Sequence, residues 1–323
     1  MRVAMWYNNR DVRVEEQQTP QIGPGEVLIR IESSGICGSD VMEWYRISRA
    51  PLVLGHEVAG TIAAIGDGVD KFKVGDRVTV AHHVPCNTCH YCLSGHHACC
   101  DTLRKTNFYP GGFCEYVRIP AINVDRGLFK LPDEMSFEEA TFSEPLGCVV
   151  RGQRIARIQP GQSVLIIGTG ISGILHLATA RSMGAGRIIA MDTIKYRLEQ
   201  ALKFGANAVI PTDQDVPAQL RRVNDGLLAD LVIICRGAWI PIGLNCVERG
   251  GTVLFFGGAR EDAKVPNPVN ELFWRTEVTL TSSYASPPAD TIAAINMIAA
   301  GSIPVREMIT HRLSLAESGI GFQ

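Results

Sequence analysis

Residues 164–173, VLIIGTGISG, place an apolar run directly before a glycine-rich turn and a second apolar segment. The run Val164–Ile167 predicts a buried strand, and the helical spacing of apolar residues over 171–183 predicts a helix. Between them, Gly168, Gly170 and Gly173 form the G-x-G-x-x-G pattern in the context where it binds a dinucleotide. We therefore predict that this turn holds a pyrophosphate against the free N–H groups of the helix start.

The acidic residue Asp192 ends the next predicted strand, which covers residues 187–191. A carboxylate at this position can accept hydrogen bonds from the ribose of NAD, and it repels the extra phosphate of NADP. Lys195 and Arg197 follow closely, so weak use of NADP is an alternative, and an ordinary strand–helix turn is another. The predicted NAD-binding residues are Gly168, Gly170, Ile171, Ser172, Gly173, Asp192 and Arg197.

The two halves of the chain differ in the periodicity of their apolar residues. From about 145 to 300, apolar strands alternate with helical segments, which predicts a parallel, doubly wound sheet. Residues 1 to about 130 instead hold short β-type runs broken by glycine, without long helical periodicity, so this half is predicted to be mostly β. The fold class is therefore α/β. The further predicted strands are 27–31, 58–65, 77–80, 115–119, 208–210, 231–234 and 253–256, and a further helix is 195–204.

Composition narrows the classes of function. The chain has 323 residues, of which 46% are hydrophobic and 20% charged, and its net charge is −2. This profile is typical of a globular protein, and it favours neither nucleic acid nor a membrane surface as a partner. The first residues lack a secretory leader, and no apolar run is long enough to span a bilayer, so we expect a cytoplasmic protein. Ten cysteines then indicate metal binding or catalysis rather than disulfides.

Four cysteines carry the most specific local motif. Cys86, Cys89, Cys92 and Cys100 follow the spacing C-x2-C-x2-C-x7-C within CNTCHYCLSGHHACC. Four thiolates at short spacing suit tetrahedral zinc and leave no open position, so the predicted role is structural. Free or disulfide-linked cysteines are the alternative, and Cys99 is out of register. Five histidines crowd the same segment, and we interpret them as surface residues rather than as competing ligands: His82, His83, His90, His96 and His97.

A second set of metal-ligating residue types is spread along the chain. Cys37 lies in GICGSD, His56 and Glu57 lie in LGHEVAG, and Glu144 lies in SEPLGC. Thiolate, imidazole and carboxylate can form a catalytic zinc site, because three protein ligands leave one position for water or substrate. Each residue alone is more often a packed or solvated side chain. Glycines lie beside these residues, and they support the prediction of a site because glycine lets the backbone turn tightly and approach closely.

With these motifs in order, the chain resembles the zinc-containing medium-chain dehydrogenase/reductase superfamily. Residues 55–69, GHEVAGTIAAIGDGV, match the pattern G-H-E-x2-G-x5-G-x2-V, and PGEVLIR, VGDRV, GGFCEYV and the glycine-rich turn fall in family order. The resemblance implies a GroES-like catalytic domain over 1–150, completed by 303–323, and a Rossmann NAD-binding domain over 151–302. It also implies an active site between the domains, and a homodimer or homotetramer.

The resemblance also implies roles for single residues. Cys37 and His56 match catalytic zinc ligands, while Glu57 and Glu144 compete as the third ligand. The segment EPL at 144–146 is similar to the polyol and threonine dehydrogenase branch. Ser39 matches a hydroxyl that relays the substrate proton. Asp40 matches a carboxylate that orients His56, a usual partner of a metal-bound imidazole.

Together these features predict an enzyme with about two Zn²⁺ ions per chain and NAD. It would oxidise a secondary alcohol of a polyol, sugar alcohol, cyclitol or amino alcohol to a ketone. The alternatives are an epimerase or lyase that uses tightly bound NAD, and a non-catalytic NAD- or zinc-binding protein. Met42 stands where many relatives have a relay histidine, and Arg236 where they have a small residue. Candidate pocket aromatics are Trp44, Tyr45, Tyr109 and Tyr284.

Overall fold

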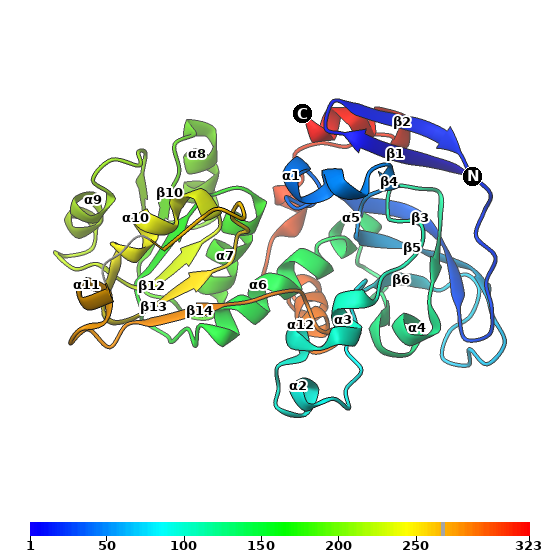
Figure 1. The fold of residues 1–323 in the computed structure, drawn as a ribbon, viewed down its shortest axis with the longest axis horizontal. Helices are drawn as coiled ribbons and strands as arrows, with labels where there is room; N and C mark the ends of the chain where they lie inside the picture. Colours follow the sequence, from blue (N-terminus) through cyan, green and yellow to red (C-terminus); the bar gives the residue numbers. More distant parts are fainter. Residues whose placement is uncertain (266–268) are drawn as a thin grey trace. The chain divides into compact units, whose positions relative to one another are not determined.

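The computed structural model describes residues 1–265 and 269–323, which form two compact units (Figure 1). The first unit contains Met1–Gly147 and Ala285–Gln323, and the second contains Cys148–Tyr284. Residues 285–302 group with the first unit, whereas the division made from the sequence assigned them to the second domain. Close packing joins these segments: a Cβ added at Gly147 would lie only 2.0 Å from Ser286 Oγ.

The first unit is built on two antiparallel sheets. The larger has the strand order β7-β3-β5-β6-β8 and the smaller the order β2-β1-β4. In β3, Val27 and Ile29 are buried and Arg30 is exposed, the alternation that a half-buried strand requires. The strands are β1 (Arg2–Asn8), β2 (Asp11–Glu16), β3 (Val27–Gly35), β4 (Leu52–Val53), β5 (Glu57–Ile65), β6 (Arg77–Val80), β7 (Tyr116–Ile119) and β8 (Leu128–Lys130).

Short helices connect these strands, and the end of the chain returns to its beginning. The C-terminal segment lies beside β1 and β2 in Figure 1, and the Phe322 ring packs edge-on against Phe113 in the core of this unit. The helices are α1 (Glu43–Arg46), η1 (Ile47–Arg49), α2 (His90–Leu93), η2 (His97–Cys99), α3 (Asp101–Lys105), α4 (Ala121–Gly127), α5 (Phe137–Ala140), α12 (Pro288–Ala299), η4 (Val305–Met308) and η5 (Leu315–Phe322).

The second unit contains one six-stranded parallel sheet of order β11-β10-β9-β12-β13-β14, flanked by helices (Figure 1). Helices lie between successive strands in the chain, as parallel pairing demands. The strands are β9 (Val164–Ile167), β10 (Ile188–Met191), β11 (Ala208–Ile210), β12 (Ala229–Ile234), β13 (Val247–Phe255) and β14 (Thr279–Ser282). The helices are α7 (Ile171–Ser182), α8 (Lys195–Lys203), α9 (Val216–Val223), η3 (Gly237–Trp239), α10 (Ile240–Leu244) and α11 (Val269–Phe273), while α6 (Ser143–Ile155) leads in from the first unit.

Strand β9 lies inside the parallel sheet, between β10 and β12, and all four of its residues are wholly buried. Burial of each such side chain stabilises the fold by about 1.5–3 kcal/mol, so the strand anchors the glycine turn that follows it. The predicted α/β fold class is confirmed. Among the described residues, no helix combines the length and apolar character needed to cross a membrane.

His176 on α7 is a wholly buried histidine, and its burial favours the neutral form of the ring. Its Nδ1 lies 3.2 Å from Gln153 Nε2, and its ring meets Phe256 edge-on. Burial lowers the pKa of His176 to about 3. In the unfolded chain His176 is protonated below about pH 6.5, whereas in the folded chain it is protonated only below about pH 3. The free energy of unfolding therefore decreases as the pH falls from 6.5 to 3.

Replacing this side chain by an uncharged amide should weaken the acid sensitivity. We expect the free energy of unfolding of the wild type, relative to His176→Gln, to decrease by about 1.4 kcal/mol per pH unit below about pH 6. Urea titrations at pH 7.5, 6 and 5 measure this difference. Parallel pH dependence of the two proteins would contradict the assignment.

Candidate metal and cofactor sites

The pairing of β3 with β5 brings the first three candidate ligands together. Gly35 at the end of β3 pairs with Glu57 at the start of β5, and Cys37 and His56 flank this pair in the chain. The ligand atoms of Cys37, His56 and Glu57 all lie within 4.8 Å of one another. The sheet register alone thus converts two segments about 20 residues apart into one group of thiolate, imidazole and carboxylate.

Asp40 organises this group from behind. Its side chain is wholly buried, and its Oδ2 accepts a hydrogen bond of 3.2 Å from the backbone N–H of Cys37. Its Oδ1 lies 3.4 Å from His56 Nδ1. A carboxylate on Nδ1 fixes the ring and directs Nε2 toward a metal, as the resemblance implied.

The pKa shifts in this group indicate that a bound cation would stabilise its charged ligands. Burial raises the pKa of Cys37, and the neighbouring Glu57 charge adds to this effect. Burial likewise raises the pKa of Glu57 to about 8, against the attraction of His56. Burial lowers the pKa of His56, but the Asp40 charge outweighs it and holds that pKa well above the usual value. Anionic ligands crowded in a low-dielectric site are stabilised by a divalent ion, so the donor set fits zinc.

Gly35 leaves the room that the Glu57 carboxylate occupies. A Cβ at Gly35 would lie 2.1 Å from Glu57 Oε2, which is closer than any real contact. The neighbouring Gly38 has no heavy atom within 4 Å of its added Cβ. The glycine at 35, rather than the one at 38, is therefore part of the ligand geometry.

Glu144 and His82 form the other side of the same site. Glu144 lies buried in the first turn of α6, and His82 follows the end of β6. Their side chains, together with His56, place one ligand atom each within 4.8 Å of one another. The prediction that His82 is a surface histidine is wrong, because its side chain is only 12% exposed. Strand β6 pairs with β5, so it carries His82 inward beside His56.

Arg46 also lies at this site, and nothing in the sequence pattern singles it out. Its Nη2 donates a hydrogen bond of 3.0 Å to Ser39 Oγ, and its Nε donates one of 3.1 Å to the Ser39 carbonyl. The same Nη2 lies 3.6 Å from Asp40 Oδ1, and the side chain is only 14% exposed. The positive charge of Arg46 thus lies beside the hydroxyl of Ser39, the predicted proton relay, which follows Cys37 by two residues in the chain.

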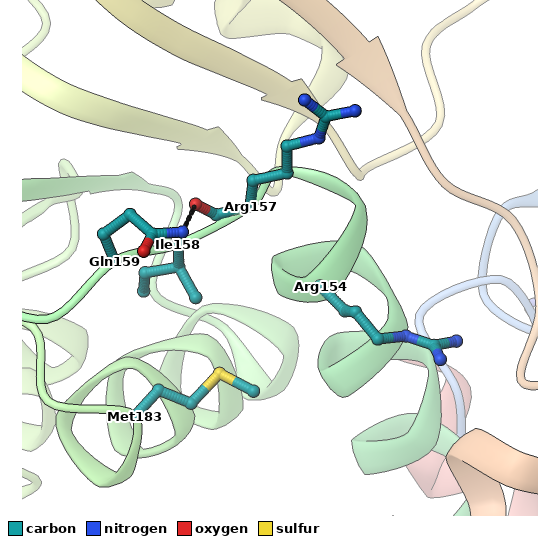
Figure 2. A pocket seen from close by; sticks show the side chains of 5 residues that line it. All are labelled: Arg154, Arg157, Ile158, Gln159 and Met183. Atoms are coloured by element: carbon teal, nitrogen blue, oxygen red, sulfur yellow. Dashed lines mark hydrogen bonds between the residues drawn. The ribbon is translucent and has the colours of Figure 1, made fainter.

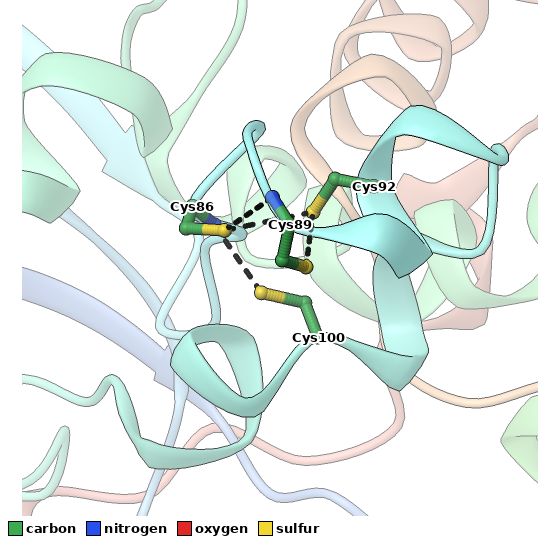
Figure 3. A group of neighbouring side chains, drawn as sticks. All are labelled: Cys86, Cys89, Cys92 and Cys100. Carbon is green, nitrogen blue, oxygen red and sulfur yellow. Dashed lines mark hydrogen bonds between the residues drawn. The ribbon is translucent and has the colours of Figure 1, made fainter.

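The four predicted structural cysteines converge on one point (Figure 3). The Sγ atoms of Cys89 and Cys92 lie 3.6 Å apart, and those of Cys86 and Cys92 lie 4.0 Å apart. A zinc tetrahedron with bonds of about 2.3 Å has edges of about 3.8 Å, so the spacing fits a zinc cluster of four thiolates. The backbone N–H of Cys89 donates to Cys86 Sγ, and that of Cys86 to Cys100 Sγ.

The loop around this four-cysteine cluster carries two exposed histidines, His90 and His96, and the half-buried His97. Cys99 is exposed and lies outside the group of four. The Thr88 backbone N–H is the main cause that lowers the pKa of Cys86, which favours the thiolate that zinc binds.

The glycine-rich turn of the second unit has the open form that a phosphate needs. Gly168 has a φ of +92°, and a Cβ at Gly173 would lie 2.1 Å from the Gly168 carbonyl oxygen. Gly170, which precedes the first turn of α7, has no heavy atom within 4 Å of an added Cβ. Ile171 and Ser172 begin α7, where free N–H groups favour an anion.

Asp192 lies at the end of β10 and is wholly buried against this turn. Its Oδ2 accepts hydrogen bonds from the Thr169 N–H and hydroxyl, and its Oδ1 accepts one from the Ile194 N–H. The Arg197 guanidinium lies 3.7 Å from Asp192 Oδ2. The carboxylate therefore braces the phosphate-binding turn as well as placing a negative charge beside it.

The other candidate residues belong to neither metal group. The exposed Arg236 borders Gly168 and stacks over the Trp239 ring. A surface pocket at the ends of α6 and α7 is lined by arginine, glutamine and apolar side chains: Arg154, Arg157, Ile158, Gln159 and Met183 (Figure 2). The four candidate pocket aromatics are all more than two-fifths exposed: Trp44, Tyr45, Tyr109 and Tyr284.

A catalytic-type metal group, a four-cysteine cluster and a phosphate-binding turn define the class of a two-domain metal-dependent oxidoreductase. Comparison with known proteins agrees. The Alcohol dehydrogenase GroES-like domain matches residues 23–133, and the Zinc-binding dehydrogenase domain matches residues 172–300. Probable D-xylulose reductase A of Aspergillus clavatus is 34% identical, over 97% of this chain and 90% of its own length.

Sorbitol dehydrogenase of Bacillus subtilis is 31% identical, over 98% of this chain and 91% of its own length. A solved structure described as a zinc-binding dehydrogenase of Sinorhizobium meliloti, bound to NADP, is 27% identical with a TM-score of 0.88. That match covers 99% of this chain and 94% of the other. The chain belongs to the zinc-containing medium-chain alcohol dehydrogenase family, which acts on CH–OH groups, in its polyol branch.

A methyl group at Gly35 should displace the Glu57 carboxylate and weaken the metal group. We expect Gly35→Ala to lower the zinc affinity of the Cys37 site by about tenfold or more, because positioning of ligands has effects of this size. Gly38→Ala is the matched control and should keep the wild-type affinity, since nothing lies near its added Cβ. Competition titration with a chromogenic chelator measures both. Equal affinities in the two variants would refute the role of Gly35.

Proposed function

We propose that this protein oxidises a secondary alcohol of a polyol to a ketone and transfers the hydride to NAD. The observation that carries the proposal is the group of Cys37, His56 and Glu57, with the Ser39 hydroxyl two residues from its thiolate. The named activities of the D-xylulose reductase and sorbitol dehydrogenase relatives support a polyhydroxylated substrate. Cys37, His56 and a carboxylate would hold the catalytic zinc, and Cys86, Cys89, Cys92 and Cys100 would hold the structural zinc.

The bound zinc supplies a Lewis acid that lowers the pKa of a substrate hydroxyl. The chain's own residues hold its ligands and handle the proton. Asp40 keeps the His56 ring in the tautomer that presents Nε2, and it holds the backbone of Cys37 through Oδ2. Either Glu57 or Glu144 supplies the carboxylate ligand, since both are buried beside His56.

Ser39 receives the proton of the substrate hydroxyl at Oγ. Because Arg46 already donates to that oxygen, the Ser39 O–H is directed away from Arg46 and is available to pass its own proton onward. Arg46 itself cannot accept a proton under ordinary conditions, so it positions the hydroxyl and stabilises negative charge there. Met42 offers no proton acceptor, so the proton would leave through water or through a ribose hydroxyl that a bound cofactor would supply.

The preference for NAD rests on Asp192. Its charge at the end of β10 opposes a phosphate on the ribose 2′ position, and its bonds to Thr169 fix the turn that binds the pyrophosphate. Gly168, Gly170 and Gly173 let the cofactor backbone approach that turn, and Ile171 and Ser172 present the helix N–H groups. The nearby positive charge of Arg197 weakens the repulsion between Asp192 and the extra phosphate of NADP, so we expect measurable activity with NADP.

Absorbance at 340 nm tests the proposal directly. The zinc-loaded protein should form NADH with xylitol or sorbitol, should reduce D-xylulose with NADH, and should respond weakly to ethanol and to NADP. Zinc is counted in the same samples. A cofactor that stays bound and never appears as free NADH would replace the proposal with an epimerase or lyase. Zinc and NAD binding without turnover on any alcohol would indicate a non-catalytic protein.

The role of Arg46 has its own test. Arg46→Met should lower kcat by about tenfold or more with little change in KM, because proton transfer, not binding, loses its support. The rising limb of the pH profile should move to higher pH, since a positive charge that favours deprotonation is gone. Arg49→Met is the matched control. Arg49 is an exposed arginine that stacks over the Tyr45 ring. Equal kcat losses in both variants would contradict the assignment.

A further inference from the structure

Arg236 is a cation beside the glycine-rich turn of the second unit, and the proposed reaction gives it no role. Strands β9 and β12 pair in register, Ile167 with Ile234, and the Cys235 N–H donates a hydrogen bond of 2.9 Å to the Ile167 carbonyl. The two strands therefore end side by side. A Cβ added at Gly168 would lie 3.2 Å from the Arg236 Cβ, so the Arg236 side chain begins beside the first glycine of the turn.

The guanidinium of Arg236 is ordered by an aromatic ring. Its central carbon lies over the Trp239 ring, 4.5 Å from the ring centre, and Trp239 is only 8% exposed. Arg236 itself is exposed. The contact with the ring orders the arginine and consumes none of its N–H donors, because a cation–π attraction is not a hydrogen bond. The N–H groups of Arg236 are thus held near the turn and can donate to a ligand.

Charge pairing distinguishes Arg236 from the cations that follow β10. Lys195 pairs with Glu199 at 3.8 Å, and the Arg197 guanidinium lies 3.7 Å from Asp192 Oδ2. In the part of the chain that the structure describes, no carboxylate lies within ion-pair distance of Arg236. Its positive charge is therefore available to an anion that binds at the turn.

The charges on the two sides of the turn are opposite. Strands β10 and β12 flank β9 in the sheet. On the β10 side lies the buried Asp192 carboxylate, which bonds the turn at Thr169. On the β12 side lies Arg236. A pyrophosphate is anionic on both of its phosphates, so the start of α7 attracts it while Asp192 opposes it. A guanidinium on the β12 side offsets this repulsion, and it can donate two parallel N–H bonds to a phosphate.

We propose that Arg236, held in place by Trp239, binds the pyrophosphate of the nicotinamide cofactor from the β12 side of the glycine-rich turn. This inference rests on the proposed function, which supplies the identity of the dinucleotide. It adds a full positive charge to the backbone N–H groups of the turn. Arg236 acts on NAD and NADP alike, because both contain the pyrophosphate, whereas Asp192 distinguishes them at the ribose.

Binding of ADP-ribose and of adenosine tests the proposal without reference to activity. ADP-ribose contains the pyrophosphate and adenosine has no phosphate, and isothermal titration calorimetry on the zinc-loaded protein measures both. Arg236→Gln should weaken ADP-ribose binding by about tenfold or more, because a charged hydrogen bond to phosphate is lost. Its affinity for adenosine should match that of the wild type. Arg236→Lys keeps the charge without the planar fork, so its affinity for ADP-ribose should lie between the two. Circular dichroism checks that each variant folds.

Arg249 provides the matched control. Its side chain is 81% exposed, and it lies near the start of β13, where Val247 pairs with Ala229 at the start of β12. The glycine-rich turn instead follows the end of β9, at the opposite edge of the parallel sheet. Arg249→Gln removes the same charge from the same unit, and it should bind ADP-ribose as the wild type does.

Two results would overturn the role of Arg236. One is an Arg236→Gln variant with unchanged affinity for ADP-ribose, or with an equal loss of affinity for adenosine. The other is a loss of affinity for NADP with none for NAD, which would place Arg236 at the ribose phosphate. A wild type that binds ADP-ribose but forms no NADH from any polyol would instead defeat the proposed function, and the role of Arg236 in binding would stand.

Discussion

The contact between the buried Asp40 carboxylate and His56 Nδ1 is the constraint on which the candidate metal chemistry depends. It decides which nitrogen of His56 faces the ligand groups, and it couples that choice to the Cys37 backbone through the other carboxylate oxygen. Asp40 also lies within 3.6 Å of the Arg46 guanidinium, which reaches the Ser39 hydroxyl. One buried charge thus aligns a metal ligand, a thiolate loop and a proton-handling hydroxyl.

Sheet register supplies the rest of the geometry. Antiparallel pairing puts the Cys37 loop opposite His56 and Glu57, and the next strand, β6, delivers His82 to the same end. The parallel sheet of the second unit does the equivalent work for the cofactor residues, because β9 and β10 end side by side at Gly168 and Asp192. In both units the functional side chains follow strand ends, where the backbone is rigid and the side chains are free to point into a site.

Much of this could be predicted because local patterns decide it. Strands β6, β9 and β11 have the predicted limits, since apolar runs bounded by turn residues leave little choice. The four-cysteine spacing identified its cluster without any tertiary information. The sequence groups His82 with the exposed His90 and His96 and so predicts a surface position, whereas the pairing of β5 with β6 places His82 beside His56. Arg46 gives no signal of its own, since its role depends on a side-chain path back to Ser39 across a short helix.

Crystals of the zinc-loaded protein, measured by anomalous diffraction on both sides of the zinc edge, test the central claim most directly. We expect one peak among Cys86, Cys89, Cys92 and Cys100, and a second peak bonded to His56 Nε2 with Asp40 still in contact with Nδ1. A second ion bonded through Nδ1, or absent from His56 altogether, would contradict this description of the site.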